Sequence, residues 1–390
     1  MYDVIIIGSG ASGLFLGKLL EDKNILVLEK TNSSGNKLLL TGNGRCNLTN
    51  YKDNKELLRQ YTYNNKFLYS TINNYNAIDI YNYFNDRVPL KIENSDCVFT
   101  KSNKAKDILD SLIIPKIIYN TKVTKIIKRD NSYLVITNNK EYETLNLVCA
   151  TGGLTYPKTG SEGDIFNFCN DLALNYTKPF PVETSIILKN NPNLAGISFD
   201  NVRVTSNKYQ YDGHLIFTHK GLSGSAIMKI SEHIYLDNLS SINIDFIVNY
   251  SLSDFNKLLN SNRDKQIITT LNTILKNRFS EYLLNKLNID KTKLTKQLIH
   301  LEIENIFNQL KTFKFEVFKV EDITSAIITG GGISTKELNP KTFESKKYPN
   351  LYFIGECVDM HGPIGGYNLT LAFSSAYSSY KAIINHLDID

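Results

Sequence analysis

The feature that most constrains the fold is a glycine-rich turn near the amino terminus, between an apolar strand and an amphipathic helix. Residues 2–29 read YDVIIIGSGASGLFLGKLLEDKNILVLE, with the pattern G-x-G-x-x-G at positions 8–13. This spacing predicts a β–α–β unit in which Gly8 allows the tight turn, Gly10 lets a pyrophosphate approach the backbone and Gly13 lets the helix pack on the sheet. The free N–H groups and positive dipole end of the helix suit a bound phosphate.

An acidic residue closes this unit. Glu29 follows the predicted strand 25–28 and lies 21 residues after Gly8 (29 − 8). A carboxylate there accepts hydrogen bonds from ribose hydroxyls and repels a 2′-phosphate. The unit therefore predicts a dinucleotide with an unphosphorylated adenosine half, in preference to a glycine turn with a purely structural role.

The middle of the chain favours FAD over NAD as that dinucleotide. Strand-like stretches at 123–127, 133–137 and 145–150 predict a short β-meander, and the last one runs into Thr151-Gly152-Gly153. A meander that returns the chain beside the first strand resembles the crossing segment of the glutathione-reductase-type FAD domain.

The carboxyl-terminal part adds a second argument for FAD. A predicted strand at 350–354 finishes on Gly355-Glu356, where FAD proteins of that type place an acid on the ribityl chain. Residues 362–368, GPIGGYN, then lead into a predicted helix at 369–386. A glycine-rich helix start can stabilise negative charge on the flavin pyrimidine ring during reduction. An NAD-only domain needs neither feature, and the alternative is a buried turn with a packing helix.

Residues 41–50, TGNGRCNLTN, form a polar run without an amphipathic period. The run is rich in backbone N–H donors and hydroxyls and carries the fixed charge of Arg45. Such a segment suits an anionic ligand, and the alternative is a solvated loop in which Arg45 pairs with an exposed acid.

Composition limits the class of protein. A chain of 390 residues predicts two or three structural units, and a net charge of +5 is too modest for a nucleic-acid signature. The five cysteines lack a C-x-x-C pair, which argues against a disulfide framework or a zinc site and favours a reducing compartment. We find no apolar run of about 18 residues and no basic leader, so we expect a cytoplasmic protein with no membrane contact.

The periodicity predicts the domain organisation. We expect an α/β fold with a discontinuous Rossmann-like FAD-binding domain of glutathione-reductase type, formed by residues 1–185 and 323–390. Short alternating strands predict an inserted β-rich, barrel-like module at 186–250. A helical period with a start signal at Ser251 predicts an inserted helical module at 251–322.

Catalytic candidates are few because a flavin itself would carry the hydride chemistry. His219 follows a predicted strand and could exchange protons near neutral pH, although a hydrogen-bonded structural histidine is the alternative. Cys46 lies in the polar run but has no nearby partner cysteine, which favours a packing role. His361 could line the substrate side. Asp359 could bind a cofactor hydroxyl or hold its own loop, and we favour the cofactor role.

The chain resembles the HI0933-like flavoprotein family, also called NAD(P)/FAD-dependent oxidoreductases or aminoacetone-oxidase-family FAD-binding enzymes. The resemblance is carried by residues 8–13, 35–50, 151–164, 217–228, 328–338 and 351–377. It implies that the polar run lies along FAD, with Lys37 and Arg45 offsetting anionic charge. The complete set of predicted cofactor-binding residues is Gly8, Gly10, Ala11, Ser12, Gly13, Glu29, Lys30, Lys37, Thr41, Gly42, Gly44, Arg45, Cys46, Asn47, Val123, Thr151, Gly152, Gly355, Glu356, Asp359, Gly365, Gly366, Tyr367, Asn368 and Leu369.

Three functions compete. In the first, which we favour, NADH or NADPH docks transiently and reduces FAD, which then reduces a small organic acceptor such as a conjugated enone. In the second, an amine or amino ketone reduces FAD and dioxygen reoxidises it. The third is a flavoprotein that modifies or binds RNA; we rank it last because the basic residues are dispersed and not interleaved with aromatics. The sequence makes no prediction of oligomeric state.

Overall fold

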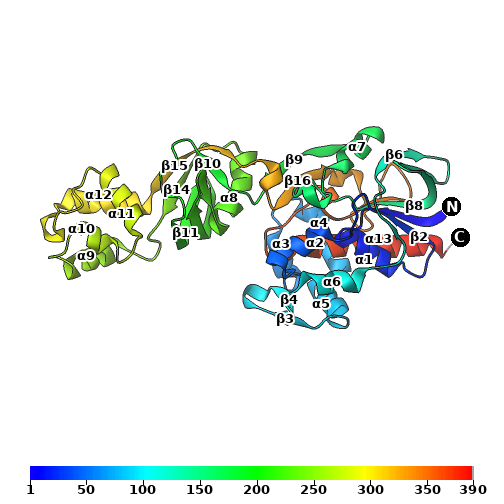
Figure 1. Cartoon of the computed structure of the whole chain (residues 1–390), viewed down its shortest axis with the longest axis horizontal. Helices are drawn as coiled ribbons and strands as arrows, with labels where there is room; N and C mark the ends of the chain where they lie inside the picture. The colour runs from blue at the N-terminus through cyan, green and yellow to red at the C-terminus, as the bar shows by residue number, and fades with distance from the viewer. Residues whose placement is uncertain (389–390) are drawn as a thin grey trace. The chain divides into compact units, whose positions relative to one another are not determined.

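The computed structural model describes residues 1–388, and the chain divides into two compact units. The first unit comprises Met1–Phe180 and Ile327–Asp390, and the second comprises Pro181–Ala326 (Figure 1). Each unit has its own core of buried apolar side chains. The first unit is therefore discontinuous in sequence, and the second is one continuous insertion.

The first unit is built on a seven-stranded sheet in the order β5-β2-β1-β8-β7-β6, with β17 paired to β8 off this path. The pairs β1–β2, β1–β8, β2–β5 and β8–β17 are parallel, whereas β6 and β7 form an antiparallel meander with β8. The apolar run 4–7 is buried throughout, as expected for a central parallel strand covered on both faces. The strands are β1 Tyr2–Ile7, β2 Ile25–Leu28, β5 Ile117–Ile118, β6 Val123–Lys128, β7 Tyr133–Thr137, β8 Glu141–Cys149 and β17 Leu351–Phe353.

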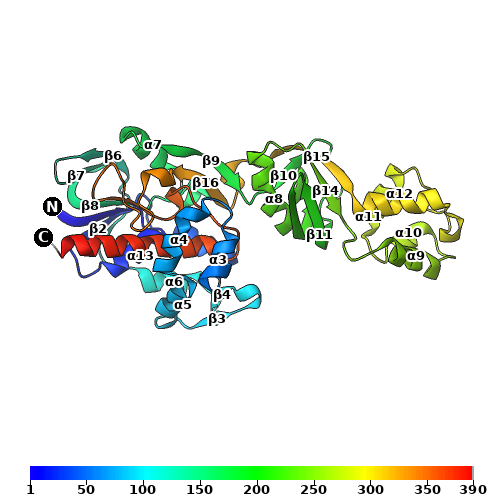
Figure 2. The same ribbon diagram turned by 180° about the vertical axis from the view of Figure 1, so that it is seen from behind.

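Helices and two small sheets complete the first unit. The longest helix of the described residues, α13, packs against α1, and Figure 1 shows the two next to each other. Figure 2 shows α13, in red, from the opposite side. The small sheets pair β3 with β4 and β9 with β16. These elements are α1 Ala11–Leu19, α2 Asn36–Leu40, α3 Asn54–Gln60, α4 Asn65–Asn74, α5 Ala77–Asn85, β3 Leu90–Ile92, β4 Val98–Thr100, α6 Ala105–Leu112, α7 Asp164–Asp171, β9 Tyr176–Val182, β16 Ile328–Ile333 and α13 Tyr367–Leu387.

The second unit contains a closed six-stranded barrel in the order β10-β13-β12-β11-β14-β15. Helix α8 follows β13, and four further helices lie in sequence between β14 and β15. The elements are β10 Ile186–Leu188, β11 Ser198–Ser206, β12 Tyr209–Phe217, β13 Gly221–Ser223, α8 Ser225–Leu236, β14 Ser241–Asp245, α9 Leu252–Ser261, α10 Ile267–Leu271, α11 Asn277–Lys286, α12 His300–Lys311 and β15 Phe313–Val320. The expected α/β fold with an inserted barrel and helices is thus confirmed.

Two details of the insertion bear on the sequence analysis. The start of α9 is as predicted, because Ser251 caps the helix and forms a reciprocal capping box with Asp254. Strand β15, in contrast, falls inside the range 251–322 that we assigned to the helical module. It pairs with β10 and β14 and closes the barrel. Its partners lie far away in sequence, so a local period could not assign it to the barrel.

Within residues 1–388, none of the helices combines the length and the apolar content needed to cross a lipid bilayer. The same residues hold no cluster of three or more histidine, cysteine or acidic side chains with the arrangement of a metal site.

Candidate active site

A cavity of about 350 Å³ lies at the carboxyl ends of the parallel strands of the first unit. Its walls include Ile7 at the end of β1, Leu28 at the end of β2, and Ala150 directly after β8. Doubly wound sheets bind ligands in this place, because the loops that follow adjacent parallel strands diverge there. Every lining residue belongs to the first unit.

The first glycine turn opens one side of the cavity. Gly10 precedes α1, and a Cβ atom added to it would find no heavy atom within 4 Å. Gly13 has the opposite surroundings, since its added Cβ would lie 2.0 Å from the carbonyl oxygen of Gly8. Gly10 therefore borders open space, and Gly13 permits the close contact between helix and strand.

A second helix start reaches the same cavity from the carboxyl-terminal part of the chain. Helix α13 begins after Gly366, whose φ of 93° and close approach to Thr49 exclude a side chain. Gly365, Gly366 and Asn368 line the cavity. The Asn368 side chain also holds the turn, since it accepts from the N–H of Gly362 at 2.9 Å and donates to its carbonyl at 2.8 Å. Two helix N-termini thus contribute to one cavity.

Glu29 lies at the end of β2, is buried, and lines the cavity. Its Oε2 atom accepts hydrogen bonds from the N–H and hydroxyl of Ser9, at 2.8 and 2.7 Å. Its Oε1 atom accepts from the N–H and hydroxyl of Thr31, both at 2.8 Å. Four donors hold the carboxylate in place, so it presents a fixed negative charge at this end of the cavity.

The ammonium group of Lys30 pairs with acids other than the neighbouring Glu29. Its Nζ atom lies 2.6 Å from Asp164 and 3.0 Å from Glu162. Both Lys30 and Asp164 line the cavity. The lysine is therefore neutralised by acids of the segment 151–164 and adds no net positive charge beside Glu29.

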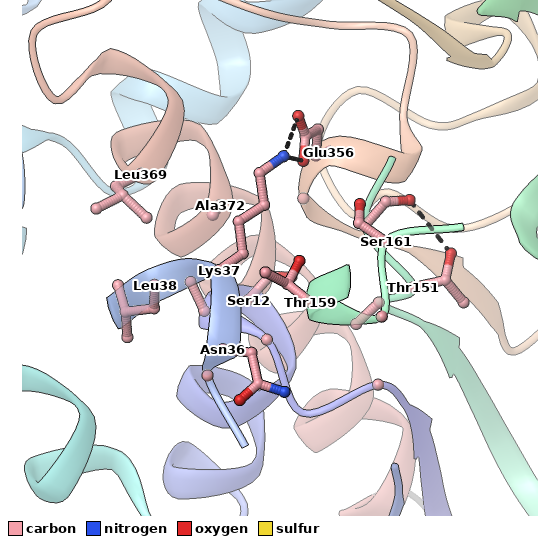
Figure 3. A pocket seen from close by; sticks show the side chains of 18 of the residues that line it. Ser12, Asn36, Lys37, Leu38, Thr151, Thr159, Ser161, Glu356, Leu369 and Ala372 are labelled. Carbon is pink, nitrogen blue, oxygen red and sulfur yellow. Dashed lines mark hydrogen bonds and ion pairs between the residues drawn. The ribbon is translucent and has the colours of Figure 1, made fainter. Parts of the chain in front are cut away.

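An ion pair between Lys37 and Glu356 crosses the cavity wall (Figure 3). The Nζ atom of Lys37 lies 2.6 and 2.9 Å from the two carboxylate oxygens, and it also donates to the Thr155 hydroxyl at 2.6 Å. Glu356 accepts a further bond from the N–H of Thr329 at 3.0 Å. Because both charged side chains remain about one quarter exposed, the pair contributes little stability. It fixes Glu356, which we expected on the ribityl chain, beside Lys37, which we expected to offset anionic charge.

The polar run folds into a compact loop at the cavity. Gly42 and Asn43 have left-handed backbone conformations, and the Thr41 hydroxyl donates to the carbonyl of Leu38 at 2.6 Å. Thr41, Gly42 and Asn47 line the cavity. The Oδ1 atom of Asn47 is buried without a hydrogen-bond partner among the described residues. It is therefore an acceptor available to a ligand N–H.

The structure does not place Arg45 or Gly44 among the lining residues. The Arg45 guanidinium bonds to the Glu93 carboxylate and the Asn103 amide, and it lies 4.1 Å over the Phe99 ring. This arrangement is the alternative considered above, an arginine paired with an acid. The identity of the partners could not be read from the sequence, because both lie about fifty residues further along the chain.

Cys46, Gly13 and Tyr367 also lie outside the lining. Cys46 is fully buried, and burial raises the pKa of its thiol to about 12. The thiol is protonated at neutral pH and is no nucleophile, so a packing role fits this residue. Tyr367 is buried as well and meets the ring of Tyr61 edge-on at a centroid distance of 5.8 Å.

The two histidine candidates have different surroundings. His219 is exposed at the turn between β12 and β13 in the second unit, and that unit contributes no residue to the cavity lining. His361 directly follows Met360, which lines the cavity. Its ring is buried and stacks on Tyr63 at a centroid distance of 4.6 Å. Of the two histidines, His361 therefore lies next to the cavity wall in sequence, whereas His219 belongs to the other unit.

Asp359 holds its own loop. Its Oδ2 atom accepts from the Thr177 hydroxyl at 2.6 Å, and its backbone carbonyl accepts from the Asn64 amide at 2.6 Å. Asp359 is buried and does not line the cavity. We favoured a cofactor-binding role for Asp359, and the structure instead shows its carboxylate bonded to Thr177 and not among the lining residues.

Most of the predicted cofactor residues come together in the cavity. The predicted residues that line it are Gly8, Gly10, Ala11, Ser12, Glu29, Lys30, Lys37, Thr41, Gly42, Asn47, Val123, Thr151, Gly152, Gly355, Glu356, Gly365, Gly366, Asn368 and Leu369. Sequence reasoning missed further lining residues, among them Phe99, Thr159, Gly160, Asp164, Ile327, Ile328, Met360 and Ile364. The residues at 159–164 lie within a segment that carries the family resemblance, and this resemblance could have indicated them. No sequence signal indicated Phe99.

The residues around the cavity fit FAD. Open space at Gly10 beside a helix start suits a pyrophosphate, and the fixed carboxylate of Glu29 suits a ribose. The second helix start at Gly366 and the free acceptor of Asn47 supply polar groups for a ring system. These groups of the chain would therefore suit the pyrophosphate, the ribose and the ring system of FAD.

The fold and the cavity define a Rossmann-like flavin-binding protein. The 3-ketosteroid delta1-dehydrogenase from Sterolibacterium denitrificans has the same fold, with a TM-score of 0.52, 12% identity and coverage of 99% of both chains. Residues 2–382 match the family described as the HI0933-like protein Rossmann domain. The chain belongs to this family, and it is an FAD-dependent oxidoreductase.

Three relatives match along the whole chain. The chain is 29% identical to the ribosomal RNA dihydrouridine synthase of Escherichia coli (strain K12), over 98% of each chain. It is 26% identical to the enzyme of the same name from Haemophilus influenzae, over 97% of this chain and 98% of that one. It is 24% identical to the 3-dehydro-bile acid delta(4,6)-reductase of Clostridium scindens, over 97% of this chain and 98% of that one.

Proposed function

We propose that this enzyme uses reduced FAD to saturate a carbon–carbon double bond conjugated to a carbonyl, and that its substrate is a uridine of ribosomal RNA. The observation that carries the proposal is the full-length similarity to two ribosomal RNA dihydrouridine synthases. Forming dihydrouridine requires reduction of the C5=C6 bond of uracil, which is conjugated to the C4 carbonyl. The delta(4,6)-reductase name describes the same bond type in another substrate.

This proposal reverses the order in which the sequence analysis ranked the functions, because RNA modification stood last there. It keeps the chemistry of the first-ranked function, reduction of a conjugated double bond by a reduced flavin. As in the first-ranked function, we propose that NADH or NADPH supplies the electrons that reduce FAD. The second candidate, favoured by the bile-acid enzyme, is the same reduction of a small conjugated ketone.

Bound and reduced FAD would supply a hydride to the electron-poor carbon of the double bond, and a proton must reach the neighbouring carbon. The chain's residues orient the reactants. Met360 and Leu369 form an apolar part of the cavity wall, which would keep water away from the reacting groups. The amides at the start of α13 favour negative charge that develops near them. His361 is our candidate for moving the proton, because it adjoins the wall at Met360.

The test uses ribosomal RNA of the source organism transcribed in vitro, which carries no modified nucleosides. We expect the purified enzyme with FAD and NADH or NADPH to form dihydrouridine in this RNA, detected by its mass after digestion to nucleosides. Reduction of a conjugated steroid ketone without any product in RNA would support the second candidate instead. Hydrogen peroxide production with an amino ketone would favour the oxidase alternative.

A further inference from the structure

A second groove lies in the first unit, between the start of helix α4 and the segment that follows β16. It has a volume of about 570 Å³. The lining residues are Asn64, Asn65, Lys66, Phe67, Thr335, Lys336, Leu338, Pro340 and Lys346. They include three lysines and no acidic residue, so the groove is positively charged.

The lysine charges are available to a partner. Lys66, Lys336 and Lys346 are exposed, and among residues 1–388 no carboxylate pairs with any of them. The neighbouring acid, Glu337, instead accepts a hydrogen bond from the Asn175 amide. The Nζ atom of Lys346 donates to the carbonyl of Lys336 at 2.9 Å, which keeps two of the three lysines on one wall.

The groove adjoins the wall of the flavin cavity. Asn64 lines the groove, and its amide donates to the carbonyl of Asp359 at 2.6 Å. The next residue, Met360, lines the flavin cavity. The groove residue Asn64 is thus joined by one hydrogen bond to Asp359, whose neighbour in sequence, Met360, lines the flavin cavity. A molecule held in the groove would therefore lie near the cavity that carries the redox chemistry.

We propose that this groove binds the sugar–phosphate backbone of the RNA whose uridine is reduced. Three unpaired ammonium groups attract consecutive phosphates through a sequence-independent term that releases counterions. Phe67 and Pro340, which are partly exposed, provide apolar contacts for sugars and bases between the phosphates. The inference rests on the proposed function, since it names where that RNA substrate docks.

Some of the basic residues that are dispersed in the sequence come together in this groove. Lys346 is one of the dispersed basic residues that led us to rank RNA modification last. The fold brings it to Lys336 and to Lys66 from a distant part of the chain. A patch assembled from separate segments is invisible to a search for local charge runs.

The experiment compares two triple variants of the full-length enzyme. K66Q/K336Q/K346Q removes the groove charges. K55Q/K101Q/K125Q removes three exposed and unpaired lysines elsewhere in the same unit and changes the net charge equally. Bound FAD per chain and the unfolding midpoint check that both variants are folded. Affinity for the in vitro ribosomal RNA is measured by fluorescence anisotropy over a series of salt concentrations.

We expect the groove variant to lose about tenfold or more in affinity, and its slope of log affinity against log salt to fall by about 2, the value for three phosphate contacts on a single strand. The control variant should stay within about threefold of the wild type, allowing for general electrostatic attraction. If the triple variant no longer binds FAD, the RNA affinities of the three single variants are measured instead. Each single variant should then lose about twofold in affinity for the RNA.

Equal losses in the two triple variants, or no loss in either, would overturn the groove as the docking site. The proposed function would stand in that case, provided that the wild type still forms dihydrouridine in this RNA. A wild-type enzyme that neither binds nor reduces the RNA would overturn both proposals together. The two failures are therefore distinguishable.

Discussion

Replacing Gly10 by glutamate is expected to yield a folded protein that no longer retains FAD. The Cβ position of residue 10 points into open space, with no heavy atom within 4 Å, so the new side chain enters the cavity without disturbing the protein. There it meets the expected position of the pyrophosphate. Two like charges 4 Å apart repel by about 4 kcal/mol at an effective dielectric of about 20, which is about a thousandfold in affinity.

The readout is the amount of FAD that the purified variant carries, with circular dichroism to verify folding. Gly10→Ala is the matched control for folding, because a methyl group fits the space that is open in the cofactor-free protein. It carries no charge, so it should weaken FAD retention less than glutamate does. FAD bound to the glutamate variant at the wild-type level would place the pyrophosphate elsewhere and contradict the assignment of the first glycine turn.

Replacing Gly13 by alanine should destabilise the first unit, although it adds only a methyl group. The added Cβ would lie 2.0 Å from the carbonyl oxygen of Gly8 and 3.2 Å from the Cβ of Ala150. The oxygen belongs to the backbone of a tight turn at the end of β1, so helix α1 must move away from the sheet. Overpacking of this kind costs about 3 kcal/mol.

Urea denaturation followed by circular dichroism measures this loss as a shift of the unfolding midpoint. Gly10→Ala again serves as the control, since the same substitution three residues earlier meets no atom and should change stability by less than about 1 kcal/mol. Equal stability of the two alanine variants would contradict the distinct roles that we assign to the two glycines.

The elements of the FAD-binding fold could be predicted where sequence periods are long and their boundaries are marked. The strand–turn–helix at residues 2–19 and the strands 25–28 and 133–137 lie where the pattern placed them. Helix α13 begins two residues before the predicted start, because Gly366 rather than the apolar period sets the boundary. Local signals of this kind depend only on neighbouring residues.

Features that depend on distant partners could not be predicted. Strand β5 has only two residues and exists because it pairs with the edge of β2. Strand β15 belongs to the barrel because β10 and β14 flank it. The partners of Arg45 and the lysines of the groove also come together only in the folded chain. Sequence reasoning therefore located the cofactor cavity, whereas the surfaces around it required the structure.

The most direct test of the account is the flavin content of the purified wild-type protein. The two helix starts at Gly10 and Gly366, together with Glu29, predict a yellow protein that releases FAD in an amount equal to that of the chain. A colourless protein that stays colourless after incubation with excess FAD would contradict the central claim. Release of a flavin without the adenosine half would contradict it as well, because Glu29 would then have no ribose to bind.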